Sequence, residues 1–217
     1  MPSRRDFLAF CITGLAGGFA RSAQAVSLPP PTGEKAAPGH KLETAILAGG
    51  CFWGVEGVFQ HVRGVRSVVS GYAGGQAETA HYDMVSTGTT GHAEAVKITF
   101  DPAHISYGRL LQIFFAVAHD PTELNRQGPD VGSQYRSAIF ATNGEQARIA
   151  ADYVAQLGKI GVFGGRIVTR IEGAASFYPA EAYHQDFMAR NPRHPYILAN
   201  DVQKIIALRQ TFPDLYR

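Results

Sequence analysis

The amino-acid sequence predicts a domain of the α/β class, in which helices pack on one mixed sheet. Its 217 residues, of which 45% are hydrophobic, are enough for the core of one domain with some residues outside it. Strand-like and helix-like hydrophobic patterns alternate along the chain without internal repeats, and few strands are joined by tight hairpins. We therefore expect helices between the strands rather than a sheet made of hairpins.

The first predicted elements flank a tight turn. The apolar run in Thr44–Ala48 predicts a buried strand, and the two glycines that follow it allow a sharp turn. Apolar residues then recur at helical spacing in Phe52–Arg63, and Gly64 stands where that helix would stop. This pattern predicts a strand, a turn and then a helix that begins at Cys51.

The remaining elements follow in chain order. Asn143 with Gln146 three residues later is typical of a helix start, and Gly158 marks the expected end of that helix. The predicted strands after the first are Val65–Tyr72, Ala93–Phe100, Ser137–Thr142 and Arg166–Glu172, and the predicted helices after the first are Ser106–Ala118, Asn143–Leu157, Ala180–Arg190 and Asp201–Arg209.

The first 25 residues predict an export signal. The Arg4-Arg5 pair precedes a short apolar stretch that is interrupted by glycines, and the small residues around Gln24 fit a cleavage site. A twin arginine before so short a stretch is typical of an export address rather than a membrane anchor. We therefore expect residues 1–25, which include Cys11, to be removed, and the protein to be periplasmic or otherwise exported by the twin-arginine route.

The sequence after the signal divides into a linker and a folded domain. Residues 26–40 are proline-rich and aperiodic, which predicts a flexible or extended linker, and residues 41–217 form the domain with a C-terminal helical tail. Removal of the signal leaves equal numbers of basic and acidic residues, so nothing indicates a nucleic-acid partner. No further apolar run is long enough for a membrane span, so we expect no stable membrane association.

Cys51 is the one cysteine that remains after the signal is removed. A lone thiol in an exported domain has no internal disulfide partner, which favours a reactive role. At a helix start, unpaired backbone N–H groups and the helix dipole favour the thiolate. We expect a nucleophile beside an exposed Phe52-Trp53 pair and an apolar pocket. The alternative is a cysteine that only fills space in the core.

Glu94 is a candidate general acid. On the predicted strand Ala93–Phe100 it shares a face with Val96, Ile98 and Phe100, an apolar row that should point inwards. Burial there would raise the pKa of the carboxyl group and keep it protonated near neutrality. The alternative is a glutamate at the strand end that turns to solvent or pairs with an arginine.

Two long polar loops, at residues 71–92 and 119–136, carry further candidates. Tyr82 lies in the first loop, and Asp130 and Tyr135 lie in the second. A buried tyrosine hydroxyl seeks a hydrogen-bond partner, and a developing oxyanion is one such partner. Either tyrosine could instead pack at the edge of the core.

The histidines offer one candidate base and no metal site. They are scattered, without an H-E-x-x-H pattern or paired cysteine ligands. His184, on the predicted helix Ala180–Arg190, could serve as a base for Cys51 in a Cys-His acyl hydrolase, but no hydrolase-like motif gives it an Asn or Asp partner. A further alternative is a non-catalytic peptide-binding module whose Phe-Trp pair grips apolar side chains.

Several motifs point together to one family. “GGCFWGVE”, “SGYAGG”, “TGHAEAV”, “NRQGPDVGSQYRSAI” and “FYPAEAYHQ” occur in this order over roughly residues 41–200. This set is similar to the peptide methionine sulfoxide reductases of the A type, one of two enzyme classes that repair methionine sulfoxide. The resemblance implies a two-layer α/β sandwich with a ferredoxin-like core.

The resemblance also implies a reaction and its catalytic residues. Cys51 would attack the sulfoxide sulfur of the S epimer, in proteins or as the free amino acid, and would become a sulfenic acid. Glu94 would donate a proton to the departing oxygen. Tyr82 and Tyr135 would hydrogen-bond that oxygen.

Substrate binding falls to three further residues. Phe52 and Trp53 would line the apolar pocket for the S-methyl group, and Asp130 would help to organise it. The implied partners are oxidised methionine in proteins and peptides and a thiol donor, with no bound cofactor. Many members of the family carry a resolving cysteine in the C-terminal tail, whereas the tail “HPYILANDVQKIIALRQTFPDLYR” has none. Oxidised Cys51 would therefore need a thioredoxin-like protein, a glutaredoxin-like protein or a small thiol.

The export signal is testable through its arginine pair. Replacing Arg4 and Arg5 together by lysine should leave the precursor in the cytoplasm, because the twin-arginine route reads the pair itself. Cell fractionation followed by immunoblotting measures where the processed form accumulates. Processed double-lysine protein in the periplasm would contradict this route.

Overall fold

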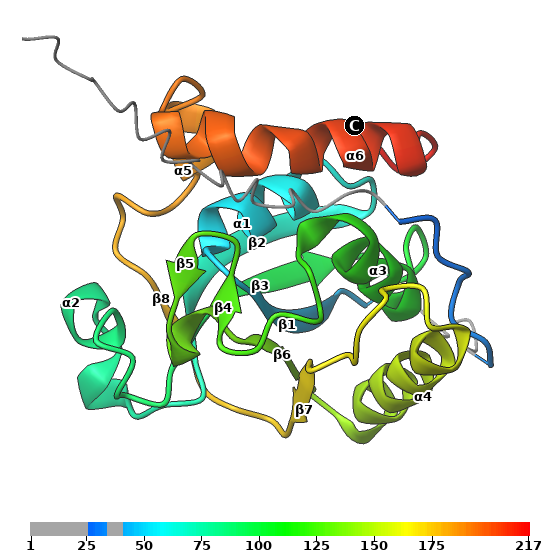
Figure 1. The fold of residues 1–217 in the computed structure, drawn as a ribbon, viewed down its shortest axis with the longest axis horizontal. Coiled ribbons are helices and arrows are strands. Elements are labelled where there is room, and N and C mark those ends of the chain that lie inside the picture. Colours follow the sequence, from blue (N-terminus) through cyan, green and yellow to red (C-terminus); the bar gives the residue numbers. More distant parts are fainter. Residues whose placement is uncertain (1–25, 34–40) are drawn as a thin grey trace, which may run out of the picture.

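The computed structural model describes residues 26–33 and 41–217. The predicted signal at residues 1–25, with Cys11, and the linker residues 34–40 lie outside the described residues. Figure 1 shows the described chain as a central sheet with helices α1, α3, α4 and α6 around it.

One six-stranded mixed sheet organises the molecule. Its strands lie in the order β7-β6-β1-β3-β2-β8, and all neighbours are antiparallel except β6 and β7. The strands are β1 Glu43–Gly49, β2 Val65–Ala73, β3 Ala93–Phe100, β6 Ser137–Phe140, β7 Arg170–Glu172 and β8 Phe177–Pro179, while β4 Arg126–Gln127 and β5 Asp130–Val131 pair as a separate hairpin.

The helices begin and end close to the predicted positions in the first two thirds of the domain. They are α1 Phe52–Gln60, α2 Tyr82–Val85, α3 Tyr107–Ile113, α4 Gly144–Ile160, α5 Phe187–Arg190 and α6 Val202–Thr211, with π-helical turns at Phe114–Ala118 and Ile197–Asp201 and 3₁₀ turns at Ala77–Thr79 and Ser133–Tyr135. Asn143 caps α4 by accepting a hydrogen bond from the Gln146 backbone N–H, as predicted. None of the described helices has the length and apolarity that a membrane span requires.

The chain order of these elements gives the expected core. β1, α1, β2, β3, α3 and β6 form a β-α-β-β-α-β unit whose strands lie in the order β6-β1-β3-β2, which is the ferredoxin-like arrangement. The α/β class with a mixed sheet and packed helices, predicted from the sequence, is therefore confirmed.

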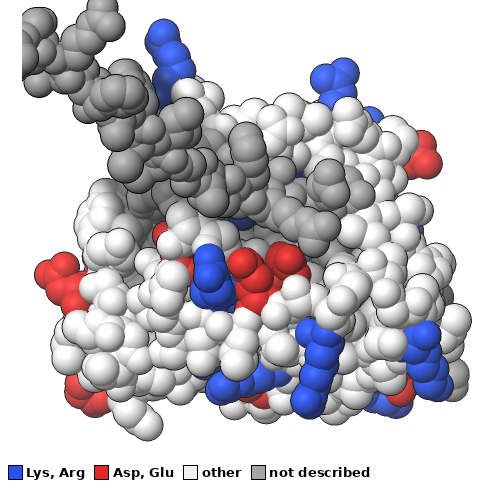
Figure 2. Space-filling model, viewed as in Figure 1, with Lys and Arg blue, Asp and Glu red and all other residues white. Residues whose placement is uncertain are grey.

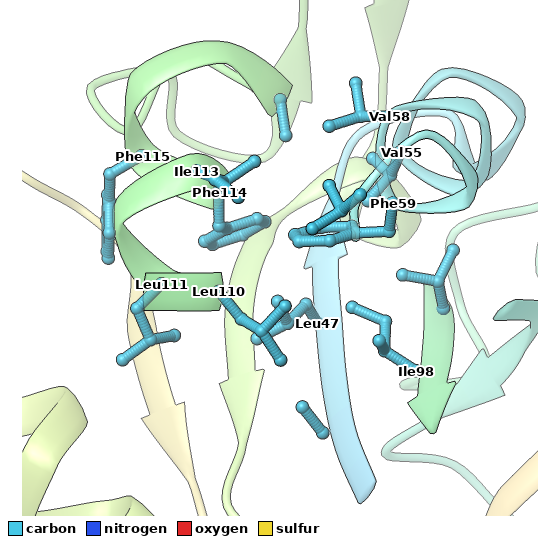
Figure 3. Packing of buried hydrophobic residues seen from close by; sticks show 14 of the residues in the cluster. Leu47, Val55, Val58, Phe59, Ile98, Leu110, Leu111, Ile113, Phe114 and Phe115 are labelled. Atoms are coloured by element: carbon cyan, nitrogen blue, oxygen red, sulfur yellow. The ribbon is translucent and has the colours of Figure 1, made fainter. Parts of the chain in front are cut away.

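Most of the core lies between the sheet and the helices on one of its faces. Figure 3 shows side chains of α1 and of the chain from α3 onwards meeting over two strand residues, Leu47 and Ile98. The opposite face carries a smaller cluster that includes Ile46, Ala95 and Phe140. Because side chains alternate along a strand, Glu94 points to the same face as Ile98, toward α1. The predicted inward face of the Glu94 strand is confirmed by its burial.

The predicted helix Ala180–Arg190 is wrong over most of its length. Only Phe187–Arg190 is helical, and residues 182–186 form a turn. Asp186 adopts a left-handed backbone with φ of 54°, and its N–H donates to the buried Glu56 carboxylate at 3.0 Å. Tertiary hydrogen bonds thus hold this segment in a shape that its helical apolar spacing does not predict.

The predicted linker is partly docked on the domain. Residues 26–33 contain no helix or strand, as expected for an extended segment, but Leu28 is buried in the main core. The Gln112 side-chain amide donates to the Leu28 carbonyl at 2.5 Å, and the Tyr153 hydroxyl donates to the Pro29 carbonyl at 2.9 Å. These eight residues therefore pack as a strap across α3 and α4.

The strap should contribute measurably to stability. Leu28→Ala removes a nearly buried side chain and should lower the free energy of unfolding by about 2 kcal/mol. Leu42→Ala is the matched control, since Leu42 is 46% exposed, and should change that free energy by less than about 0.5 kcal/mol. Urea denaturation of both variants measures the difference. Equal stability of the two variants would show that the strap adds nothing.

Candidate active site

The turn before α1 places Cys51 where two loops meet. Gly50 has φ of 89°, and a Cβ atom there would lie 2.5 Å from the Gln127 side chain. A Cβ atom on Gly49 would lie 2.8 Å from the Phe114 ring. The two glycines thus allow close packing of the second long loop and of the core against the turn. Cys51 follows as the N-cap of α1 and is partly exposed.

Cys51 rests as a thiol, contrary to the expectation of a favoured thiolate. Burial raises its pKa well above the usual value, and the negative charges of Glu94 and Asp201 raise it further. The Trp53 backbone N–H lowers the pKa, as a helix start should, but this effect is smaller than burial. The prediction of a lowered thiol pKa is therefore wrong, because burial at this helix start outweighs the backbone dipoles.

Glu94 lies under the same helix start and is protonated near neutrality. Its Oε2 accepts a hydrogen bond from the Phe52 backbone N–H at 3.1 Å, and the side chain is 3% exposed. Burial raises the pKa of Glu94 to about 8, with a smaller rise from Asp130, although the Phe52 N–H lowers it. The predicted desolvated carboxyl with a raised pKa is thus found in the structure.

Tyr82 and Tyr135 border the same group of residues and stay neutral. Burial raises the pKa of each phenol, and the charge of Glu94 is the next cause in both cases. The charge of Cys51 acts on both phenols as well. The structure therefore brings together Cys51, Glu94, Tyr82 and Tyr135 as one thiol, one carboxylic acid and two hydroxyl donors.

Asp130 joins this group through a residue that was not predicted. The β4–β5 hairpin carries Asp130, and its Oδ2 accepts a hydrogen bond from the Tyr196 hydroxyl. Burial is the largest cause that raises the pKa of Tyr196, and the charge of Cys51 is the second. In the sequence, Tyr196 is an isolated tyrosine of the C-terminal tail, and no motif links it to Cys51.

An aromatic wall stands beside the thiol. The Trp53 ring stacks on Phe187 with ring centroids 3.7 Å apart, and Tyr196 meets it edge-on at 5.7 Å. Trp53 is partly exposed, whereas Phe52 is 1% exposed and packs against Tyr72. The predicted exposed Phe-Trp pair is thus wrong for Phe52, because α1 turns its ring into the core.

His184 supports Trp53 rather than Cys51. Its Nδ1 accepts a hydrogen bond from the Trp53 indole N–H at 3.1 Å, and burial lowers the pKa of the imidazole. The second ring nitrogen has no hydrogen-bond partner among the described residues, so no His184–Cys51 hydrogen bond forms there. A Cys-His hydrolase would need that bond. The neutral imidazole of His184 instead holds the Trp53 indole in place.

The described residues offer no metal centre and no broad basic surface on the face drawn in Figure 2. No group of three or more His, Cys, Asp or Glu side chains that could hold a metal occurs in the described ranges. Acidic side chains gather near the middle of that face with one basic side chain directly beside them, and the other Lys and Arg side chains are scattered (Figure 2).

Comparisons with known proteins agree on one family. A family model described as peptide methionine sulfoxide reductase matches residues 43–214. A relative from Mesorhizobium japonicum, named peptide methionine sulfoxide reductase MsrA 2, is 60% identical over 183 residues, covering 84% of this chain and 93% of its own. A relative of the same name from Synechocystis is 54% identical over 172 residues, covering 79% of this chain and 80% of its own.

Solved structures agree with these relatives. Reduced Mxr1 from Saccharomyces cerevisiae has a TM-score of 0.63 at 32% identity and covers 74% of this chain and 91% of its own. Methionine sulfoxide reductase A of Corynebacterium diphtheriae has a TM-score of 0.61 at 34% identity, with 79% and 86% covered. With the family model matching most of its length, this chain belongs to the peptide methionine sulfoxide reductase family.

Proposed function

We propose that this protein is a peptide-methionine (S)-S-oxide reductase that returns the S epimer of methionine sulfoxide, protein-bound or free, to methionine. One observation carries the proposal. A protonated carboxyl, Glu94, and a thiol, Cys51, meet at the same helix start, where Glu94 accepts the Phe52 N–H. Sulfoxide reduction needs an acid at the oxygen and a nucleophile at the sulfur, and this site offers both.

The reaction balances with these two groups. The Cys51 sulfur bonds to the sulfoxide sulfur while Glu94 gives its proton to the sulfoxide oxygen. The thiol proton leaves Cys51 and restores the Glu94 acid. The hydroxyl then moves to the Cys51 sulfur: the methionine S–O bond and the new sulfur–sulfur bond break, a cysteine S–O bond forms, and a sulfenic acid and methionine are left. The cysteine sulfur is oxidised by two electrons and the methionine sulfur is reduced by two.

Proton donation explains why a resting thiol is compatible with attack. A sulfoxide sulfur becomes electrophilic once its oxygen is protonated, so the acid and the nucleophile act together. A neutral Glu94 also removes its own charge from the surroundings of Cys51, and that charge is one cause of the raised thiol pKa. The step therefore begins with both protons in place rather than with a preformed thiolate.

The remaining residues orient the substrate. Tyr82 and Tyr135 keep their protons and can donate hydrogen bonds to the sulfoxide oxygen. The aromatic wall of Trp53, which Phe187 and His184 hold in place, offers an apolar surface to the S-methyl group. Asp130 and Tyr196 border the site as a hydrogen-bonded pair, and the charge of Cys51 acts on Tyr196.

Regeneration requires a thiol from outside the chain. Residues 26–217 contain no cysteine besides Cys51, so the sulfenic acid has no partner for an internal disulfide. The electron donor is a thioredoxin-like or glutaredoxin-like protein or a small thiol. With the twin-arginine signal, the protein repairs oxidised methionine in exported proteins.

The raised pKa of Glu94 predicts how activity depends on pH. Because the acid form is needed, kcat/KM should be constant at lower pH and fall as pH rises through about 8. Cys51 titrates higher still, so this fall belongs to Glu94. Glu94→Gln should remove the inflection and lower kcat/KM by about 10²-fold, and Glu94→Ala, which donates no hydrogen bond, should lower it further. A wild-type profile in both variants would show that Glu94 is not the acid.

A single-turnover experiment tests the reaction itself. Treatment of the processed protein with one equivalent of each sulfoxide epimer, with a sulfenic-acid trap present, should yield one trapped adduct on Cys51 with the S epimer alone. Mass spectrometry measures the adduct, and Cys51→Ser should give neither adduct nor methionine. Methionine formation by Cys51→Ser within tenfold of wild type would rule out this nucleophile.

A further inference from the structure

A buried ion pair from the C-terminal segment lies beside the site and has no part in the proposed reaction. Lys204 on α6 places its Nζ 3.0 Å from the Asp201 Oδ1, three residues earlier. Asp201 is fully buried and Lys204 is 8% exposed. Buried charges of this kind are costly and are found where they are paired.

The pair rests on the side of α1 that carries Cys51. A Cβ atom on Gly54 would lie 2.1 Å from the Asp201 Oδ1 and 2.8 Å from the Lys204 Nζ. Gly54 follows Cys51 by three residues, and residues three apart share one side of a helix. Gly54 thus leaves the space that the ion pair fills, directly behind the reacting residue.

The two charges act on the site in opposite directions. The Asp201 carboxylate raises the pKa of Asp130, and the Lys204 ammonium lowers it; Asp201 also raises the pKa of Cys51. Neither Asp201 oxygen has a hydrogen-bond partner among the described residues, so Lys204 is the group that balances this carboxylate. The groups that face Cys51 are the carboxyls of Glu94, Asp130 and Asp201 and the hydroxyls of Tyr82, Tyr135 and Tyr196.

The same segment carries Tyr196. A π-helical turn, Ile197–Asp201, connects Tyr196 to the ion pair, and Ile197 is fully buried. Anchoring Asp201 on Gly54 therefore fixes where the Tyr196 hydroxyl meets Asp130 and where its ring meets Trp53.

We propose that Asp201 and Lys204 are positioning residues for the reduction: their ion pair seats the C-terminal segment on Gly54 and balances the negative charge next to Cys51. This inference rests on the proposed function, because it gives the pair a role in that reaction, whereas its test measures only the reactivity of the thiol. An anchor without an electrostatic role could be hydrophobic at no loss of stability, because replacing a buried ion pair by apolar residues of similar volume is often neutral or stabilising. The charges therefore serve the thiol beside them.

The test removes the charge of Asp201, the charge of Lys204, and both charges together. Asp201→Asn should lower the pKa of the Cys51 thiol, and alkylation by iodoacetamide should then be about tenfold faster at a fixed pH below that pKa. Lys204→Met leaves the carboxylate unbalanced and should slow alkylation by a similar factor. The double variant, Asp201→Asn with Lys204→Met, should alkylate within about threefold of the wild-type rate. Arg148→Met is the matched control, because Arg148 forms an exposed pair with Glu145 at the same three-residue spacing, and it should leave the rate unchanged.

The signs of these effects separate charge from structure. A merely structural anchor would loosen in every variant and admit the reagent faster in all of them, which would overturn the proposal, as would unchanged rates. If Lys204→Met does not fold, Asp201→Asn, Lys204→Arg and the double variant still decide it, since Asp201→Asn alone should alkylate faster and the other two should stay close to the wild-type rate. Alkylation needs no sulfoxide, so a failure of the proposed function would appear separately, as wild-type protein that alkylates as expected but reduces neither epimer.

Discussion

The site depends on one hydrogen bond, from the Phe52 backbone N–H to the Glu94 carboxyl at 3.1 Å. It joins the first residue of α1 to the middle of the sheet, and so fixes Cys51, one residue earlier, over the acid. Glu94 can take this position because its strand turns it to the helix-covered face with Ile98. The ferredoxin-like order puts β3 next to β1, the strand that leads into the turn and α1. Because β1 and β3 are neighbours, the turn that carries Cys51 lies next to the strand that carries Glu94.

Two opposing effects act on the pKa of Cys51 and on that of Glu94, and burial is the larger effect in both cases. Helix N-terminal N–H groups favour the charged forms of Cys51 and Glu94, whereas removal from water favours the neutral forms. The N–H groups contribute one backbone hydrogen bond to each residue, while desolvation acts on the whole group. The outcome is a neutral site, which suits a neutral, strongly dipolar substrate such as a sulfoxide. A thiolate and a carboxylate side by side would repel each other and leave no proton for the oxygen.

What the sequence predicts well is what depends on local periodicity. In the strand that carries Glu94, apolar and polar residues alternate from Val96 to Phe100, so its buried face follows from the pattern. The Asn143 cap likewise lies next to its partner Gln146 in sequence. The short strand β8, by contrast, has three residues and forms only because β2 offers it an edge. No periodicity can appear in three residues.

The site residues divide in the same way. Cys51, Glu94 and Asp130 stand in motifs, and the structure brings them together. Tyr196 and Lys204 lie in the tail, whereas Asp130, which binds Tyr196, and Gly54, on which Lys204 packs, come much earlier in the sequence, so only the folded chain reveals these contacts. The predicted thiol pKa is wrong for a related reason. The sequence indicates where the helix starts, but it does not indicate how deeply that start is buried.

The fixed C-terminal segment also constrains how the oxidised enzyme is reduced. Phe52 on α1, Glu94 on β3 and Asp201 next to Gly54 are all buried, each with 3% exposure or less. Cys51 itself is partly exposed, beside the partly exposed Trp53. A thiol donor must reach the same Cys51 sulfur that the sulfoxide reaches, from the partly exposed side of the site. The thiol donor therefore has to follow the path of the methionine side chain, after methionine has left. Reduction of substrate and reduction of the enzyme thus exclude each other in time, as expected when the described residues carry a single cysteine.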